Sequence, residues 1–340
     1  MNTLSQMYHL ARTLLHFKRR AIVVPAMPLR LWIESSLICN LRCIMCPNKE
    51  ITASQKGVMS FELFTKIIDE AKDFVHDINL HHRGEPLTNP NLGEMIAYAK
   101  KQGLKVRFHT NGTLLDEEKA KVILQAGPDL VSVSFDGFAK DVYEEVRAGA
   151  RFETTVENIL RFAELKKQRG QKAPYIVIER IDFAKYREQT EAGAIDELAR
   201  RFTEAGVDEI LVKEEYAWAT DEAPLLAKEE MVNMCTFPWY AMVIGWDGTV
   251  TPCPQDYRGT LPLGNLAGQS IREVWNGTGY RALRSNLLEK NDQLTVCRRC
   301  DRLCRKNVSG VPLQYLVTFL ADQFAGYGRM RRWIGTSERN

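Results

Sequence analysis

The chain has 340 residues, of which 45% are hydrophobic and 26% are charged, a composition typical of globular proteins that excludes a disordered chain or a coiled coil. The 46 Lys and Arg residues against 43 Asp and Glu leave a net charge of +3, so we expect no nucleic-acid partner gripped by a broad positive surface. The longest early apolar stretch, residues 21–29, contains two prolines and is far shorter than the roughly 20 residues of a membrane-spanning helix. The first twenty residues also lack a secretory signal pattern, which indicates a cytoplasmic protein.

Short apolar segments alternate with amphipathic helical segments from residue 31 to residue 213. This alternation is typical of repeated βα units on a parallel sheet. The predicted strands are residues 31–35, 77–81, 105–109, 130–135, 175–181 and 209–213. The predicted helices are residues 61–73, 92–102, 116–125, 152–168 and 188–205. In such a fold, ligands bind at the carboxyl ends of the strands.

The sequence changes in character after residue 213. Residues 214–230 are acidic and loop-like, and the remainder is rich in Gly, Pro, Trp and Cys with little helical periodicity. This composition is typical of a small domain that is stabilised by metal and lacks a large core. We therefore expect a barrel domain at 31–213, a linker at 214–234, a metal domain at 235–310, and flanking segments at 1–30 and 311–340.

Three of the eight cysteines, Cys39, Cys43 and Cys46, lie within eight residues just after the first predicted strand. Three thiolates can hold three irons of a [4Fe–4S] cube and leave the fourth iron open as a reaction site. Structural zinc normally has four ligands, and no fourth Cys or His occurs before His76. The spacing therefore favours an iron–sulfur cluster over zinc.

The Cys39-x-x-x-Cys43-x-x-Cys46 motif resembles that of the radical S-adenosylmethionine (SAM) superfamily, and the resemblance covers residues 31–213. It implies an α/β fold, a partial (β/α)6 TIM-like barrel, in which SAM chelates the open iron of the [4Fe–4S] cluster. It also implies that an electron from a flavodoxin- or ferredoxin-type donor cleaves SAM to methionine and a 5′-deoxyadenosyl radical. The family usually has an aromatic residue before the third cysteine, where this chain has Met45, whose thioether can also pack against adenine.

The segment Arg83-Gly84-Glu85-Pro86 resembles the Gly-Gly-Glu-Pro segment of the same family and differs only at its first residue. The resemblance implies that Gly84 permits a close backbone approach to SAM and that the Glu85 carboxylate accepts from the SAM amino group.

Three further residues are weaker candidates for contacts with SAM. Asn111, after the third predicted strand, and Ser134, at the end of the fourth, resemble ribose- and carboxylate-contacting positions. Arg180 in the fifth predicted strand is a candidate for the SAM carboxylate, although an arginine there can equally be structural. The histidines His81, His82 and His109 are expected to line the barrel wall, with a hydrogen bond to substrate as the alternative.

Cys235, Cys253, Cys297 and Cys300 form a second group. An Asp247-Gly248 turn predicts a hairpin whose second strand leads to Cys253, and Cys297-x-x-Cys300 can hold two corners of a metal site. The pattern resembles the SPASM and twitch extensions of radical SAM enzymes, which implies one auxiliary [4Fe–4S] cluster; a zinc site with four thiolates is the alternative. Cys304 remains, and three roles are open for it: a small buried residue, a ligand that exchanges with Cys300, or a catalytic hydrogen-atom donor.

Both ends of the chain have the pattern of basic amphipathic helices. One helical face near the start carries Leu4, Met7, Tyr8, Ala11, Leu14 and Leu15, followed by Lys18-Arg19-Arg20. A similar pattern spans residues 316–332. We expect each helix to pack on the barrel or on the other helix, with a peripheral membrane contact as the alternative.

These motifs predict a radical SAM oxidoreductase that acts on a small hydroxylated or amino-sugar metabolite, with the auxiliary cluster accepting the second electron. This reaction is implied by the resemblance to twitch-containing dehydrogenases. The alternatives are a radical epimerase that uses Cys304 as its hydrogen donor, a SPASM enzyme that modifies a peptide substrate, and a metal-binding protein without turnover.

Overall fold

The computed structural model describes residues 3–189, 192–215, 225, 234–289, 294–300, 307–308 and 311–312. Internal contacts divide the chain into two compact units. The central unit consists of Glu34–Phe64 and Asn79–Tyr216, and the terminal unit consists of Met1–Ile33, Thr65–Ile78 and Ala217–Asn340. The terminal unit thus combines segments from both ends of the chain. Helix α2 (Phe61–Ala71) and strand β2 (Asp77–Asn79) each have residues in both units.

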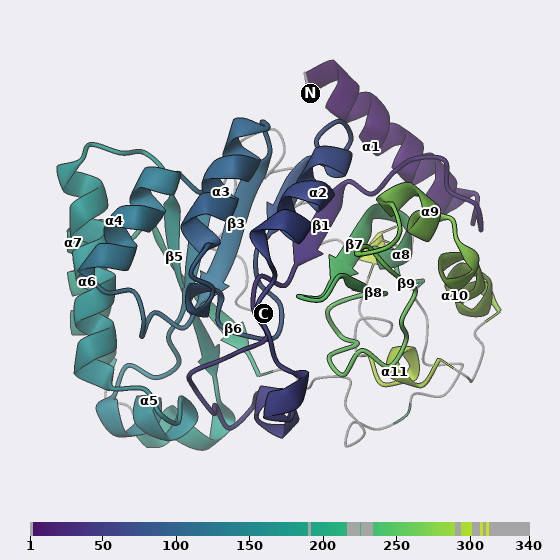
Figure 1. Ribbon diagram of the computed structural model, residues 1–340. Coiled ribbons are helices and arrows are strands. Elements are labelled where there is room, and N and C mark those ends of the chain that lie inside the picture. The colour runs from purple at the N-terminus through teal and green to yellow at the C-terminus, as the bar shows by residue number, and fades with distance from the viewer. Residues whose placement is uncertain are drawn as a thin grey trace. The chain divides into compact units, whose positions relative to one another are not determined.

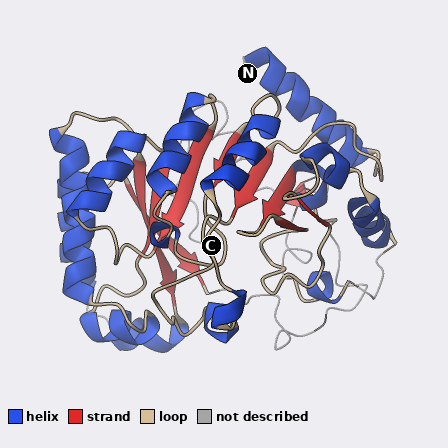
Figure 2. Cartoon of the chain, in the orientation of Figure 1, coloured by secondary structure: helices blue, strands red, loops and turns tan. Residues whose placement is uncertain are grey.

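The central unit is built on four parallel strands. Strands β3 (Lys105–Thr110), β4 (Leu130–Ser134), β5 (Tyr175–Asp182) and β6 (Glu209–Glu214) pair in that order. Helix α3 (Leu92–Lys101) precedes β3, and α4 (Glu117–Ala126), α6 (Phe152–Gln168) and α7 (Ala192–Ala205) lie in the three connections between the strands (Figure 1). Each of these four helices contacts the next. The shorter helix α5 (Lys140–Val146) precedes α6. Figure 2 shows these helices as a layer beside the strands.

The two faces of this sheet differ in polarity because successive side chains of a strand point to opposite faces. Phe108, Val131 and Ile176 are register partners and are fully buried, so they form part of an apolar face. On the other face, His109 is the register partner of Ser132, and Ser134 is the partner of Glu179. Polar side chains therefore gather on one face, close to the carboxyl ends of the strands.

The terminal unit combines a second set of strands with short helices. Strand β1 (Arg30–Ile33) pairs in parallel with β7 (Ala241–Ile244), and β8 (Thr249–Thr251) and β9 (Gly264–Asn265) continue the sheet antiparallel. The helices of this unit are α1 (Thr3–Lys18), α8 (Phe237–Tyr240), α9 (Ile271–Trp275), α10 (Thr278–Leu288) and α11 (Thr295–Arg298). Strands β10 (Asn307–Val308) and β11 (Val311–Pro312) pair antiparallel.

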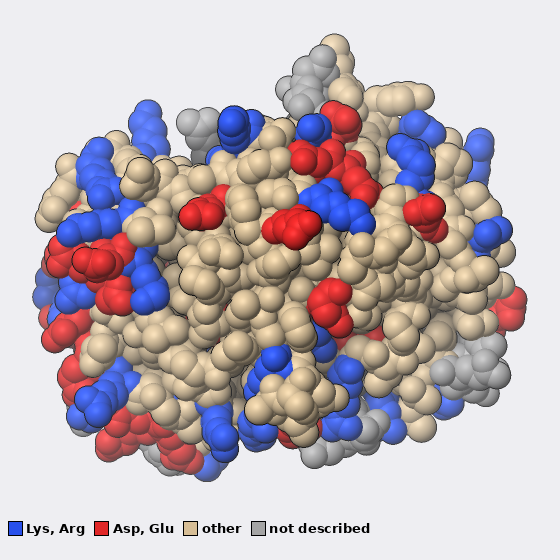
Figure 3. Space-filling view, in the orientation of Figure 1, with Lys and Arg blue, Asp and Glu red and all other residues tan. Residues whose placement is uncertain are grey.

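Short 3₁₀ helices complete the described elements. They are η1 (Pro47–Glu50), η2 (Ala53–Gln55), η3 (Pro86–Thr88) and η4 (Ala184–Gln189). None of the described helices is long and apolar enough to cross a membrane. On the face shown in Figure 3, Lys and Arg are interspersed with Asp and Glu.

All six predicted strands and all five predicted helices form, most of them with shifted ends. The first strand stops at Ile33, because Ser35 instead accepts a hydrogen bond from Met59 N (3.0 Å) and Ser36 pairs with Val58. Helix α7 begins at Ala192, and 3₁₀ helix η4 occupies the preceding turn.

The expectation of little helix after residue 213 was wrong. Helix α10 has 11 residues, and its buried side chains Tyr280, Leu283 and Arg284 have the spacing of one helical face. One of these three is a charged residue, whose guanidinium lies 4.6 Å from the centre of the Trp275 ring. A helical period read from apolar residues alone leaves out a buried arginine, so the sequence pattern did not reveal α10.

The first helix was expected to pack its apolar face on the barrel or on the other terminal helix, but that face is exposed. Leu4, Met7, Tyr8, Leu14 and Leu15 are all exposed. The helix instead buries Thr13 and Phe17, and the Phe17 ring meets the Trp239 ring edge-on at 5.7 Å. The other expected partner, residues 316–332, lies outside the described residues.

The predicted hairpin at Asp247-Gly248 forms and supplies a test of local packing. Gly248 has φ +85°, and a Cβ there would lie 2.9 Å from Ala267 N and from Asn265 Oδ1. We expect Gly248→Ala to cost about 1–3 kcal/mol, because strain and a backbone clash add together, and to lower the Tm by several degrees. Gly103→Ala is the matched control, since Gly103 has φ +82° with nothing within 4 Å of its Cβ position. Equal losses of Tm in thermal melts of the two variants under anaerobic conditions would contradict this account.

Candidate active site

The loop with Cys39, Cys43 and Cys46 belongs to the central unit. The buried side-chain amide of Asn48 connects this loop to neighbouring backbone. The Asn48 side chain donates to the carbonyl oxygens of Leu37 (3.0 Å) and Arg83 (2.9 Å). Lys56 in turn donates to Asn48 Oδ1 at 2.7 Å. These bonds fix the start of the cysteine loop against the loop that follows β2.

The backbones of these two loops touch at Gly84. A Cβ on Gly84 would lie 2.3 Å from Ser36 O and 2.7 Å from Ile38 O, so a larger residue does not fit. The next residue, Glu85, donates its backbone N–H to Ile38 O at 2.8 Å. Gly84 thus permits contact between the two loops, and its predicted approach to SAM stays a prediction.

The Glu85 carboxylate joins the loops after β2 and β3. It is buried and accepts hydrogen bonds from Leu87 N (3.0 Å), Thr110 Oγ1 (2.7 Å) and Asn111 N (2.7 Å). Burial raises the pKa of Glu85, against these donors, which lower it. With three protein donors around it, the carboxylate positions the loops; its predicted bond to the SAM amino group stays a prediction.

Asn111 extends the same network to the cysteine loop. Its Nδ2 donates to Asn40 Oδ1 at 3.0 Å, and its Oδ1 accepts from Thr113 N at 2.9 Å. Asn40 lies directly after Cys39 in the chain. The network therefore connects the end of β3 to the first of the three thiols.

Arg147 is a site residue that the sequence analysis missed. Its Nε donates to Asp136 Oδ2 at 2.9 Å, and its Nη1 lies 3.9 Å from Cys43 Sγ. Asp136 also accepts from Ile181 N at 2.6 Å. Arg147 is the residue directly after α5, a helix that was not predicted. No sequence motif therefore pointed to Arg147.

The three thiols are close enough to influence one another. Burial raises the pKa of Cys39 to about 11, and the Glu85 carboxylate and the thiols of Cys43 and Cys46 act in the same direction. Burial also raises the pKa of Cys43, against Arg147, which lowers it. Three soft thiolates held this close repel one another and need a cationic centre, so this donor set fits an iron–sulfur cluster.

The remaining predicted SAM residues occupy different environments. Ser134 is half-buried on the polar face of the sheet, as the register partner of Glu179. Arg180 lies over the Phe138 ring at 5.5 Å, and that ring packs against Phe202. Met45 packs against a buried cluster of Val142, Val146, Phe183 and Tyr186. The roles of these residues toward SAM stay predictions.

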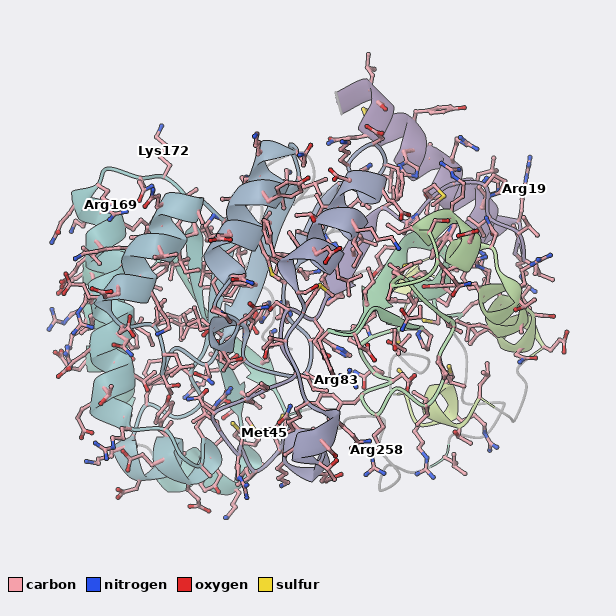
Figure 4. The ribbon with its side chains drawn as sticks, in the orientation of Figure 1. Arg19, Met45, Arg83, Arg169, Lys172 and Arg258 are labelled. Atoms are coloured by element: carbon pink, nitrogen blue, oxygen red, sulfur yellow. The ribbon has the colours of Figure 1, made fainter. Side chains whose placement is uncertain are left out.

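A buried ion pair lies beside the Gly84 loop. Arg83 donates to both oxygens of Glu34, at 2.7 Å and 2.9 Å, and His82 Nδ1 lies 3.5 Å from Glu34 Oε2. Burial alone would raise the pKa of Glu34, but the bonds from His82 and Arg83 hold it at about 2. Arg83, labelled in Figure 4, is the residue at which the Arg83-Gly84-Glu85-Pro86 segment differs from the family segment that it resembles.

The polar face of the sheet carries a cluster that includes two of the predicted wall histidines. The rings of His81 and His109 lie 4.0 Å apart, His109 Nδ1 lies 3.6 Å from Glu179, and Lys213 bonds Glu179 at 2.6 Å. Burial opposes the ionisation of Glu179, yet His109 and Lys213 lower its pKa to about 2. Burial and its cationic neighbours lower the pKa of His81, so that this imidazole is neutral.

The four predicted auxiliary ligands come together in the terminal unit. Cys235 and Cys253 pack against Phe237, Ala241 and Val243, and Cys297 lies on α11. Burial raises the pKa of Cys297, and the thiols of Cys253, Cys235 and Cys300 raise it further. Four mutually close thiols again fit a cluster or metal.

Two further observations complete this site. Cys304 lies outside the described residues. Among the residues that are described, no three His, Cys, Asp or Glu side chains already surround a position for one metal ion. The inference that these residues can hold a cluster or metal therefore rests on how close the thiols lie to one another.

Comparison with known proteins identifies two domains in the chain. The model of the radical SAM superfamily matches residues 33–177, and that of the SPASM family, an iron–sulfur cluster-binding domain, matches residues 235–301. The chain belongs to the radical SAM superfamily. The cofactors of a radical SAM enzyme with a SPASM domain are a [4Fe–4S] cluster, SAM and auxiliary iron–sulfur clusters.

Two curated relatives resemble this radical SAM enzyme over most of their length. A tungsten-containing aldehyde ferredoxin oxidoreductase cofactor-modifying protein of Pyrococcus furiosus is 28% identical, over 79% of this chain and 86% of the relative. An S-adenosyl-L-methionine-dependent 2-deoxy-scyllo-inosamine dehydrogenase of Niallia circulans is 22% identical, over 80% and 92% respectively.

Solved structures confirm the predicted fold of this radical SAM enzyme. BtrN in complex with AdoMet and 2-DOIA matches with a TM-score of 0.53 at 20% identity, over 81% of this chain and 93% of that one. The anSMEcpe enzyme with bound AdoMet matches with a TM-score of 0.56 at 18% identity, over 91% and 98%. The fold is a partial barrel with a C-terminal cluster-binding domain.

The contact at Gly84 gives a direct test of the first site. We expect Gly84→Ala to push the two loops apart and to lower the iron bound per chain and the affinity for SAM, each by about tenfold or more. Gly268→Ala is the matched control, because nothing lies within 4 Å of its Cβ position. Iron analysis and calorimetric SAM titration measure both quantities; wild-type values for Gly84→Ala would refute the proposed loop contact.

The Glu34 pair predicts a stability that depends on pH. The pKa of Glu34 falls from 4.5 to about 2 on folding, so its contribution is complete above pH 4.5 and is lost as the pH falls toward 2. That contribution is about 3 kcal/mol. Glu34→Gln should therefore lower the free energy of unfolding near neutral pH and flatten the acid limb in urea titrations. Glu117→Gln, which removes only an exposed pair with Lys121, should leave the acid limb nearly unchanged.

Proposed function

We propose that this radical SAM enzyme is an oxidoreductase that dehydrogenates a small hydroxylated or amino-sugar metabolite. The observation that carries this proposal is the cluster of His81, His109, Glu179 and Lys213 on the polar face of the central unit. A hydroxyl or amino group both donates and accepts hydrogen bonds, and this cluster offers both kinds of partner.

Each member of the cluster has a definite hydrogen-bonding character. Lys213 is a donor, and Glu179, with its pKa of about 2, is an acceptor at neutral pH. His81 is neutral, and its Nδ1 is buried with no hydrogen bond to any described group. Lys213 and Glu179 therefore offer a substrate hydroxyl or amino group one donor and one acceptor.

The cofactor ligands follow the predicted sets. Cys39, Cys43 and Cys46 hold the first cluster, and Cys235, Cys253, Cys297 and Cys300 hold the auxiliary one. Gly84, Glu85, Asn111, Ser134 and Arg180 line the SAM position. When bound, these groups supply a 5′-deoxyadenosyl radical that removes a carbon-bound hydrogen and an acceptor for the remaining electron.

The dehydrogenase relative supports this choice over peptide modification. The match spans 92% of the Niallia circulans enzyme, which is named as a 2-deoxy-scyllo-inosamine dehydrogenase. It spans 70% of SuiB, a structure solved with its precursor peptide, at a TM-score of 0.59 and 16% identity. A flavodoxin- or ferredoxin-type donor supplies the reducing electron in this proposal.

The test is to incubate the reconstituted enzyme with SAM, dithionite and metabolite extract in the absence of oxygen. One compound should lose two hydrogens in step with the formation of 5′-deoxyadenosine. Cys43→Ala should abolish 5′-deoxyadenosine, whereas Cys253→Ala should leave abortive SAM cleavage with no oxidised product. Normal turnover by Cys253→Ala would exclude an essential auxiliary cluster.

The alternatives are separated by deuterium tracing. An epimerase with Cys304 as its hydrogen donor would place solvent deuterium on the inverted carbon, and a dehydrogenase would not. Consumption of a peptide with no change in small metabolites would replace the proposed substrate class. Failure of the reduced protein to form any 5′-deoxyadenosine would support a binding protein without turnover.

A further inference from the structure

Helix α1 presents apolar side chains to solvent. Leu4 and Tyr8 are 78% and 65% exposed, and Met7, Leu14 and Leu15 lie on the same helical face. The exposed Ile22 and Val23 follow the helix. We call these seven side chains the α1 surface.

The outward orientation of the α1 surface is fixed from the opposite side of the helix. His9 Nε2 donates to Met27 O at 2.9 Å, and the buried Phe17 ring contacts Trp239. Thr13, between them, is also buried. The helix cannot rotate its apolar side inward without losing these contacts, so the exposure is a property of the fold.

Basic residues adjoin the α1 surface, and acidic residues are missing from this part of the sequence. Arg12 lies within α1, with its guanidinium 5.7 Å from the centre of the Tyr8 ring, and Lys18, Arg19 and Arg20 follow at the end of the helix. The first acidic residue of the sequence is Glu34. Figure 4 shows Arg19 pointing away from the ribbon. The surface is therefore both apolar and positively charged.

The positive charge beside the α1 surface distinguishes three possible partners: a second copy of the chain, residues 313–340, and a lipid layer. A second copy would bring the same basic residues against each other. Residues 313–340 of this chain have four arginines against Asp322 and Glu338, so they are also basic. A layer of anionic phospholipid offers negative headgroups next to apolar acyl chains and matches both properties.

We propose that the α1 surface binds peripherally to a membrane that contains anionic phospholipid. Its apolar side chains insert at the boundary between headgroups and acyl chains, and Arg12, Lys18, Arg19 and Arg20 contact the headgroup phosphates. This proposal is independent of the reaction that the enzyme catalyses.

The test is sedimentation of the full-length, cluster-loaded protein with vesicles. The protein should bind phosphatidylcholine vesicles that contain phosphatidylglycerol, bind much less to pure phosphatidylcholine, and lose affinity as salt is added. The double variant Leu4→Ser/Leu15→Ser and the double variant Arg19→Glu/Arg20→Glu should each bind the anionic vesicles about tenfold more weakly. Val122→Ser is the matched control, since Val122 on α4 is 53% exposed but outside the α1 surface, and it should bind normally.

Three results of the vesicle experiment would overturn the proposal. The wild-type protein could fail to bind the anionic vesicles, both double variants could bind as tightly as the wild type, or Val122→Ser could weaken binding as much as the double variants do. Size-exclusion chromatography adds a fourth: a wild-type dimer that Leu4→Ser/Leu15→Ser converts to a monomer would identify a second copy as the partner. Iron content and circular dichroism of each variant show whether the fold is retained.

Discussion

The close contact between two backbones at Gly84 is the constraint on which the first site depends. No side chain fits between this residue and the carbonyl oxygens of Ser36 and Ile38. The contact places Glu85 where its carboxylate can accept hydrogen bonds from the loop after β3. Three separate loops thereby become one rigid support for the thiols, and such rigidity is what positions a reactive cofactor precisely.

Charge compensation is the second theme of the central unit. The carboxylates Glu34, Asp136 and Glu179 lie at or near the ends of strands, and each is paired with a lysine or arginine. A buried carboxylate with neither a cationic partner nor hydrogen-bond donors would be strongly destabilising. The pairing lets charged groups remain close to the predicted cofactor position, and it leaves His81 as a neutral group among them.

The terminal unit is organised by long-range contacts between the two ends of the chain. Buried Arg284 donates to the carbonyl oxygens of Ile22 and Pro238, and Trp275 donates to Ala26 O. These bonds tie the segment after α1 to the helices of the cluster-binding domain. The auxiliary thiols and the α1 surface therefore belong to the same compact unit.

The sequence by itself determined the chemistry: the spacing of Cys39, Cys43 and Cys46 and the Gly84-Glu85 segment are local patterns, readable without a fold. It also determined the six strands, because short apolar segments that alternate with amphipathic helical segments are the local pattern of βα units. Only the tertiary structure decided that Arg147 lies beside Cys43 and that Glu85 connects two loops. It also decided that the His81 ring lies against the His109 ring and that α1 exposes its apolar side. Each of these depends on residues distant in sequence, and a local pattern contains no information about which distant groups will meet.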